Sequence, residues 1–284
     1  MRTRDASDSE LVLARTPRRI VSLVPSLTET LFALGVGAAV VGVTQFCEEP
    51  ATAVATLPKV GGTKTPSIET IVALKPDLVI ASTEENRAED VAALRARGVP
   101  VFVTFYPTVA AALDGIAALA AIVGVAAPAW LQGALAAVAE CAARRQAPVR
   151  YFCPIWRRPY MVARADTYMA DLLALAGGVS AFPADGPAHY FTVALADLPA
   201  AAPRVILLPD EPYRFAPRHL ADFAPYATVP ALASNRVHFV DGKALTWYGP
   251  RIPAALRTFA AHFAGASGAA ESVPAATAAS EEQR

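Results

Sequence analysis

The chain has 284 residues, of which 54% are hydrophobic and 18% are charged. These proportions are typical of a folded protein with room for two modest domains, and they exclude a largely disordered chain. Lysine plus arginine and aspartate plus glutamate number 25 each, so no basic excess predicts binding to nucleic acid.

Residues 1–17 are predicted to lack stable structure. Five charged side chains lie within positions 1–10, and the apolar run that follows, 11–14, is only four residues long. A secretory signal needs a longer apolar segment and tolerates few acidic residues. The chain as it begins therefore predicts no export signal, which places the protein in the cytoplasm if this start is the native one.

Residues 18–125 alternate short β-rich runs with helical stretches, a pattern that predicts an α/β lobe with a parallel sheet. The predicted strands are 20–24, 40–44, 78–81 and 99–104. The first helix is predicted to begin with a capping box at Ser26-Leu-Thr-Glu29. A second helix is predicted to begin at Thr65-Pro66, because proline is favoured in the first helical turn.

A stretch without charged residues, 115–139, is long enough to cross a bilayer. Gly124, Pro128 and Gly133 interrupt it, and alanine predominates over larger apolar residues, so we expect two helices and no membrane span. The second helix lies within 126–147 and is predicted to link two lobes. A helix of roughly 17 residues would span about 25 Å and act as a rigid strut.

The alternating pattern resumes over residues 148–264 and predicts a second α/β lobe. Its predicted strands are 150–153, 205–208 and 237–240, and its predicted helices are 167–176 and 251–263. The predicted fold class is therefore α/β, with two Rossmann-like lobes joined by a long rigid α-helix. Residues 265–284 are mainly Ala, Ser, Gly and Glu and are predicted to form a disordered tail.

Catalytic motifs are absent from the sequence. No GxGxxG follows a predicted strand, and GxxxxGK[ST], HExxH and GxSxG do not occur. Cys47, Cys141 and Cys153 have no CxxC spacing and are expected to be buried thiols. These features favour a non-catalytic binding protein without a catalytic cofactor. Two alternatives stay open, a cytosolic α/β enzyme and an intracellular carrier or sensor of a chelate.

Three segments of the first lobe resemble the helical-backbone (type III) substrate-binding proteins of ABC importers. They are Arg19–Gly35 (RIVSLVPSLTETLFALG), Leu57–Gly62 (LPKVGG) and Ser67–Ala81 (SIETIVALKPDLVIA). Their order and spacing match that family, and a looser likeness extends to Phe263. The cobalamin-binding branch, described as helical backbone metal receptors, is the most similar. The resemblance implies a shallow inter-lobe cleft that captures cobalamin, haem or a ferric siderophore.

Candidate ligand contacts come from loops that follow the predicted strands. Pro25 and Ser26 lie where a strand passes into a helix, which is where open α/β sheets bind ligands, although Ser26 capping its own helix is an equally good account. Trp156 and Tyr160 flank a Pro- and Arg-containing turn that suits an aromatic platform, and Arg157 within it suits ligand carboxylates or amides. The family resemblance adds Phe46, Thr63, Tyr190, Thr246, Trp247, Tyr248 and Arg251.

Two further features bear on the ligand. The resemblance implies cobalamin or another metal chelate as the ligand. Thr63 and Ser82 are small where the cobalamin branch often has tryptophan, which favours a different corrinoid or another chelate altogether. His189 is a candidate axial ligand of the chelated metal, with an ordinary surface hydrogen bond as the commoner alternative. No other protein metal ligand is expected.

The resemblance also implies one acidic docking residue in each lobe for a membrane permease. Glu69 matches the first position, although a glutamate at a helix start also stabilises the helix dipole. The second position falls near Asp197, displaced by one residue. The implied partners are an ABC permease and its ATPase, and the implied location is periplasmic or otherwise extracytoplasmic. The protein is expected to be a monomer.

Overall fold

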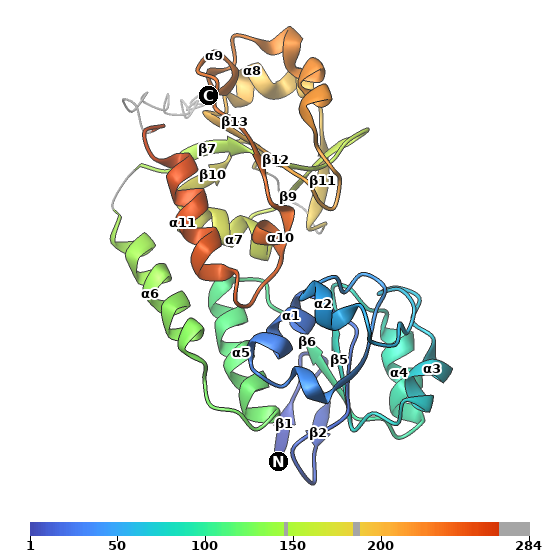
Figure 1. Cartoon of the computed structure of the whole chain (residues 1–284). Helices are drawn as coiled ribbons and strands as arrows, with labels where there is room; N and C mark the ends of the chain where they lie inside the picture. Colours follow the sequence, from blue (N-terminus) through green and yellow to red (C-terminus); the bar gives the residue numbers. More distant parts are fainter. Residues whose placement is uncertain (145–146, 184–187, 267–284) are drawn as a thin grey trace, which may run out of the picture.

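The computed structural model describes residues 1–144, 147–183 and 188–266, which form two α/β lobes (Figure 1). The first lobe is built on a four-stranded parallel sheet of order β4-β3-β5-β6. Its strands are β3 (Ile20–Ser22), β4 (Val40–Val43), β5 (Leu78–Ser82) and β6 (Val101–Thr104). Its helices are α1 (Pro25–Ala33), η1 (Gly37–Ala39), α2 (Ala51–Val54), α3 (Ile68–Ala73) and α4 (Ala88–Ala96).

The second lobe repeats this plan with a parallel sheet of order β10-β7-β12-β13. Its strands are β7 (Val149–Phe152), β10 (Gly178–Ser180), β12 (Val205–Pro209) and β13 (Val237–Val240). Its helices are α7 (Tyr168–Leu175), η2 (Leu195–Asp197), α8 (Leu198–Ala201), η3 (Pro217–Tyr226), α9 (Pro230–Ala233), α10 (Gly242–Thr246) and α11 (Ile252–Phe263). Two separate parallel sheets confirm the predicted α/β fold class.

A small antiparallel sheet that the sequence did not predict is attached to the second lobe. It has the order β11-β9-β8 and consists of β8 (Pro154–Trp156), β9 (Tyr160–Ala163) and β11 (Tyr190–Val193). The pairing of β11 with β9 joins Tyr190 to Ala163 in register. Figure 1 shows β11 on the side of the second lobe that faces the first, and Tyr190 is the first residue of this strand.

Two helices connect the lobes. They are α5 (Val109–Ile122) and α6 (Ala129–Ala143), so the linking helix lies within the predicted range 126–147 but is shorter than predicted. Its 15 residues correspond to about 22 Å at 1.5 Å per residue. At its start, the Trp130 indole donates to the Ala33 carbonyl of α1 at 3.3 Å, and at its end Glu140 pairs with Arg257 of α11 at 3.8 Å. The helix is thus attached to both lobes.

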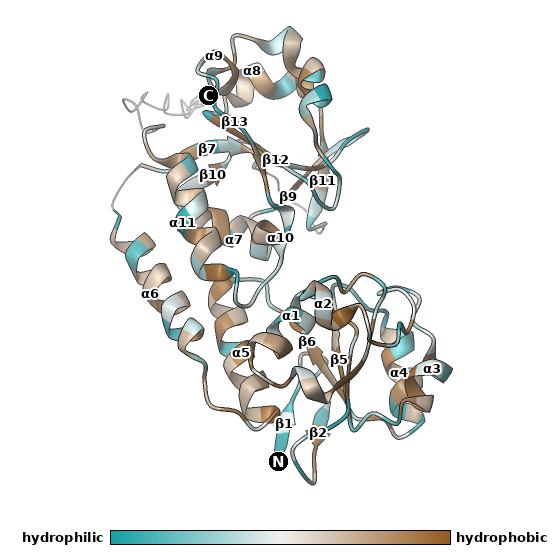
Figure 2. Ribbon diagram, in the orientation of Figure 1, coloured by the Kyte–Doolittle hydropathy of each residue, from teal (hydrophilic) through white to brown (hydrophobic). Residues whose placement is uncertain are grey.

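One hydrophobic cluster runs through both lobes and their connection. It includes Leu27 of α1, Ile116 of α5, Leu172 of α7 and Leu256 of α11, each of which is completely buried. Two smaller clusters cover the opposite face of each parallel sheet. Figure 2 shows the hydrophobic colouring on the strands of the first lobe and along α5. Because burying apolar surface is the main stabilising term of folding, the shared cluster holds the lobes together as one unit.

The prediction that residues 1–17 lack structure is wrong. Strands β1 (Arg2–Arg4) and β2 (Glu10–Val12) pair as an antiparallel hairpin, and Leu11 and Leu13 are buried in the shared cluster. Asp5 attaches this hairpin to the edge strand β6 by accepting a hydrogen bond from the Val103 amide at 3.1 Å, and to α4 by accepting one from Arg95 at 2.5 Å. Composition could not reveal this order, because the partners lie some 90 residues along the chain.

Two predicted helix starts also need correction. The first helix begins at Pro25 with Val24 as its N-cap, and no side chain caps it, so the predicted capping box does not form. Glu29 bonds instead to Arg251 of the second lobe at 2.8 Å. The helix predicted from Thr65-Pro66 begins at Ile68, where the Ser67 hydroxyl accepts from the Thr70 amide.

Among the described residues, none of the helices has the length and apolar character that crossing a bilayer requires. Residues 267–284 of the predicted disordered tail lie outside the described residues. Ala266, at the end of the described part, is buried in the shared cluster.

Candidate functional site

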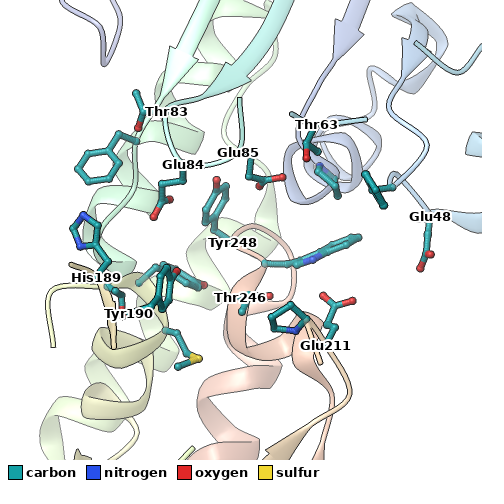
Figure 3. Close-up of a pocket in the computed structure, with 18 residues that line it drawn as sticks. Glu48, Thr63, Thr83, Glu84, Glu85, His189, Tyr190, Glu211, Thr246 and Tyr248 are labelled. Atoms are coloured by element: carbon teal, nitrogen blue, oxygen red, sulfur yellow. The ribbon is translucent and has the colours of Figure 1, made fainter. Parts of the chain in front are cut away.

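A cleft of about 850 Å³ lies between the lobes (Figure 3). Its lining residues follow the carboxyl ends of strands in both sheets: Pro25 after β3, Glu84 after β5, Phe105 after β6 and Glu211 after β12. In the first sheet, β3 and β5 are the central pair, and the strand that follows each of them in the sequence, β4 or β6, lies on its outer side. In the second sheet, β10 and β13 lie in the same way outside the central pair β7 and β12. Open α/β sheets bind ligands at this topological switch point, and here two switch points face one cleft.

Aromatic side chains from both lobes line the cleft. Phe46 of the first lobe and Tyr190 of the second are 51% and 45% exposed, so both rings present apolar surface to the cleft. Phe105 and Trp247 complete the apolar surface from opposite lobes. Exposed rings on facing walls favour a ligand with flat apolar faces, because such rings gain most from stacking and desolvation.

Trp247 is held in place by cations and acids at the junction of the lobes. The Lys243 ammonium lies 5.2 Å and the Arg251 guanidinium 5.4 Å from its ring centroid. Both cations are tied to the first lobe, Lys243 through Glu48 at 3.1 Å and Arg251 through Glu29 at 2.8 Å. Arg251 does not line the cleft, which corrects its predicted role as a ligand contact. It orients a ring that does line the cleft.

Tyr248 forms the floor of the cleft beside Trp247. The residue is 4% exposed, and its ring makes edge contacts with the rings of Tyr106 at 5.0 Å and Tyr168 at 5.5 Å between centroids. Burial, followed by the charges of Glu85 and Glu84, raises the pKa of Tyr248 well above its usual value. The phenol therefore stays protonated at physiological pH and offers a neutral surface to a ligand.

Four glutamates line the cleft: Glu48, Glu84, Glu85 and Glu211. Burial raises the pKa of Glu85 to about 7, with a further contribution from the neighbouring charge of Glu84. Burial also raises the pKa of Glu84 and of Glu211. Carboxylates respond in this way when they lose water without gaining a compensating cation. The cleft is consequently acidic as well as aromatic.

The structure brings a majority of the predicted ligand contacts together in this cleft. The lining includes Pro25, Phe46, Thr63, Tyr190, Thr246, Trp247, Tyr248 and His189. Ser26 is buried at 2% exposure and does not line the cleft, so neither of the roles considered for it, helix cap or cleft surface, is seen.

Trp156, Arg157 and Tyr160 do not line the cleft, contrary to prediction. Arg157 and the Tyr160 hydroxyl both bond to Asp222, each with a shortest distance of 2.6 Å, and this network lies within the second lobe. Trp156 packs edge-on against Tyr213 at 5.7 Å and remains 44% exposed. The turn is fixed by its own lobe because Asp222, which is 65 residues from Arg157 along the chain, satisfies its polar groups.

The two predicted docking acids lie on the surface of different lobes. The Glu69 side chain is 78% exposed in the first turn of α3 and pairs with Arg97 at 3.1 Å. Asp197 is exposed at the end of η2, next to the first residue of α8. Both carboxylates are thus accessible to a partner.

Sequence reasoning missed the acidic residues Glu84, Glu85 and Glu211 and the apolar residues Phe105 and Met169. Four of these five positions lie within four residues of the end of a predicted strand, the same kind of position as Pro25 and Phe46. Met169 lies in the first turn of α7, where only the tertiary arrangement places it at the cleft.

In the described part of the chain, no group of three or more His, Cys, Asp or Glu side chains is placed to hold a metal ion. His189 lies 3.4 Å from Asp166 through Nδ1. Cys47 is 1% exposed and is bonded to Thr28 at 3.1 Å, and all three cysteines are buried free thiols.

The fold and the cleft define a class, that of bilobal ligand-binding proteins with a helical connection. A family profile described as periplasmic binding protein matches residues 20–244. The chain belongs to this family of periplasmic binding proteins. It is therefore a substrate-binding protein of the ABC-importer type and not an enzyme.

Some relatives are named for the ligand that they bind, vitamin B12 or heme. A vitamin B12-binding protein of Vibrio cholerae is 31% identical over 193 residues, which cover 66% of this chain and 69% of that protein. A periplasmic heme-binding protein of Roseiflexus sp. RS-1 is 28% identical, with a TM-score of 0.76 over 88% of this chain and 99% of that one. The solved vitamin B12-binding protein of Vibrio cholerae, 24% identical, shares the fold with a TM-score of 0.74 over 88% of this chain and 98% of that one.

Proposed function

We propose that this protein captures a metal chelate in the inter-lobe cleft, with a corrinoid as the preferred ligand, and delivers it to an ABC permease. The observation that carries the proposal is the facing arrangement of exposed rings, Phe46 on one lobe and Tyr190 on the other, around about 850 Å³. This volume lies in the upper part of the range of roughly 300–1,000 Å³ found for small-molecule sites. The vitamin B12-binding relatives support a corrinoid.

Haem is the second candidate ligand. The heme-binding relative from Roseiflexus supports it, and His189, Met169 and Tyr190 all line the cleft with side chains of the types that ligate haem iron. Haem and a corrinoid share flat apolar faces and differ at their rims, so the aromatic walls suit both. Binding measurements with both chelates decide between them.

Trp247→Ala is expected to weaken chelate binding by about 1–3 kcal/mol, the range for losing a well-packed aromatic contact. The measurement is absorbance-monitored or calorimetric titration with cobalamin, cobinamide, haem and ferric siderophores. At least one of these should bind wild-type protein with micromolar affinity or better. Trp156→Ala is the matched control, because Trp156 is exposed and lies outside the cleft, and its affinity should equal that of wild type. Failure of wild type to bind any of the chelates would refute the proposed function.

We further propose that Glu69 and Asp197 dock the two lobes on the permease. The double variant Glu69→Arg/Asp197→Arg is expected to lose at least about tenfold in stimulation of a reconstituted permease–ATPase, because like charges at an interface cost several kcal/mol. Chelate affinity should not change, since neither residue lines the cleft. Glu89→Arg, an exposed acid on α4, serves as the charge-reversal control. Equal stimulation by all variants would exclude this docking mode.

The docking experiment also separates the remaining alternatives. The role proposed here is that of an importer component that works as a monomer outside the cytoplasm. A protein in this role should stimulate a permease–ATPase. An intracellular chelate carrier or sensor would bind the same ligand and give no response from any permease–ATPase.

A further inference from the structure

The charge of the cleft is one-sided. Four of the eighteen lining residues are glutamates, and none is a lysine or arginine. Glu84 and Glu85 project from the first lobe and Glu211 from the second, so the acids occupy both walls (Figure 3). A one-sided field between low-dielectric walls acts on any charged group that a ligand brings in.

Among the described residues, only one of these acids forms an ion pair, although the charges of Lys64, Lys243 and His189 act on the others from a distance. Glu48 pairs with Lys243 at 3.1 Å. Glu84, Glu85 and Glu211 have no ion pair with any residue that the structure describes. Lys64 donates to the Glu84 backbone carbonyl at 2.7 Å, not to its carboxylate. Three acidic side chains in the cleft are therefore available to a ligand.

These three acids also influence one another across the cleft. The charges of both Glu84 and Glu211 contribute to the raised pKa of Glu85, although Glu211 belongs to the opposite lobe. These three carboxylates are not placed to hold a metal ion together, and neither is any other group of three or more His, Cys, Asp or Glu side chains among the described residues. Their influence on a ligand must then act through charge and hydrogen bonding at its rim.

We infer that Glu84, Glu85 and Glu211 determine ligand specificity, by selecting chelates whose rim is cationic or bears amide N–H donors and by rejecting chelates whose rim bears carboxylates. This inference rests on the proposed function and names the ligand class of that same cleft. A corrinoid rim carries several carboxamides, which donate hydrogen bonds to carboxylates. Haem carries two propionates, which would meet acids of the same charge. Among corrinoids, one without the nucleotide phosphate has the better charge match.

The test compares diaquacobinamide, cyanocobalamin and hemin as probes. Wild-type protein is expected to bind cationic diaquacobinamide at least about tenfold more tightly than hemin, and this affinity should weaken as sodium chloride rises. In the triple variant Glu84→Gln/Glu85→Gln/Glu211→Gln the cobinamide affinity should fall, the hemin affinity should rise and the salt dependence of cobinamide binding should become weaker. Cyanocobalamin, with both carboxamides and a phosphodiester, should change least.

A charge-matched control separates the cleft from net charge. The variant Glu10→Gln/Glu89→Gln/Glu140→Gln alters three exposed glutamates outside the cleft and removes the same number of carboxyl groups. It should behave as wild type with every probe. The single variant Glu211→Gln repeats the test with one substitution and should show part of the change in cobinamide and hemin affinity that is expected for the triple variant. Discrimination that is unchanged in the triple variant would overturn the inference alone, whereas absence of binding by wild type would overturn the proposed function with it.

Discussion

Gly249→Ala is expected to lower the free energy of unfolding by about 3 kcal/mol, as the sum of backbone strain and a steric clash. Gly249 has φ +119°, a conformation that L side chains rarely adopt, and an added Cβ would collide with Thr30 Oγ1 on α1 of the other lobe. Thr30 cannot move aside, because it is completely buried and its hydroxyl donates to the Ser26 carbonyl at 2.9 Å. Urea or thermal unfolding monitored by circular dichroism gives the measurement.

Two controls assign this loss to the contact between the lobes. Gly35 has φ +80° and no atom within 4 Å of an added Cβ, so Gly35→Ala isolates the backbone strain and should cost about 1 kcal/mol. Thr30→Ala removes the colliding hydroxyl, so the double variant Thr30→Ala/Gly249→Ala should be more stable than additivity predicts. Equal losses for Gly35→Ala and Gly249→Ala would show that the contact is unimportant.

Glu85→Gln is expected to raise stability by up to about 3 kcal/mol at pH 8 and to change it little at pH 4, since each pKa unit corresponds to about 1.4 kcal/mol. Burial raises the pKa of Glu85 from 4.5 to about 7, so the folded protein binds more protons than the unfolded chain between these values. Stability then falls as pH rises from about 4.5 to about 7, and the loss is complete above that window. Glutamine resembles the protonated form and carries no such loss.

The measurement is the unfolding free energy of wild type and variant across pH 4–8. Glu84 and Glu211 also have raised pKa values and remain in the variant. The decrease of the unfolding free energy with rising pH should therefore become smaller in the variant without vanishing. Lys64 lowers the pKa of Glu85 and His189 lowers that of Glu84, both as lesser contributions than burial. Glu89→Gln on the exposed face of α4 should reproduce the wild-type curve. A variant curve parallel to that of wild type would contradict the assignment.

These two predictions connect stability with function. Gly249 directly follows Trp247 and Tyr248, so the contact that fixes the lobes also fixes the aromatic floor of the cleft. Above neutral pH the ionised Glu85 carboxylate lowers the stability of the folded protein without ligand. A ligand that supplied a hydrogen-bond donor to this carboxylate would remove part of that cost. Functional sites often carry groups that are unfavourable until a ligand satisfies them.

The predictions that held from sequence were those governed by neighbouring residues. The strand at 237–240 was predicted with its observed bounds, and α7 begins where Thr167 was expected to start a helix. Aromatic residues at strand ends, such as Phe46, and in the loop around Trp247 line the cleft as predicted. Alternating hydrophobicity and capping depend on side chains a few positions apart, so the order of the residues is enough to read them.

The incorrect predictions concerned polar residues whose partners are distant in sequence. Arg157 and Tyr160 looked available for a ligand, but Asp222 binds both. The N-terminal residues looked unstructured, but Arg95 and Val103 hold Asp5. A charged side chain without a local partner looks the same in a sequence whether it is free or paired, because only the folded chain shows which distant charges meet.

By itself, therefore, the sequence determined the α/β class, the two lobes with a helix between them, and the family resemblance. The tertiary structure alone decided which residues face the cleft and which charges there remain unpaired. Arg251 and Glu29, for example, lie 222 positions apart and meet at 2.8 Å only when both lobes are assembled. The physical reason is that hydrophobic periodicity is a local property, whereas the electrostatic environment of a cleft depends on the positions of all surrounding charges and on the water that folding removes.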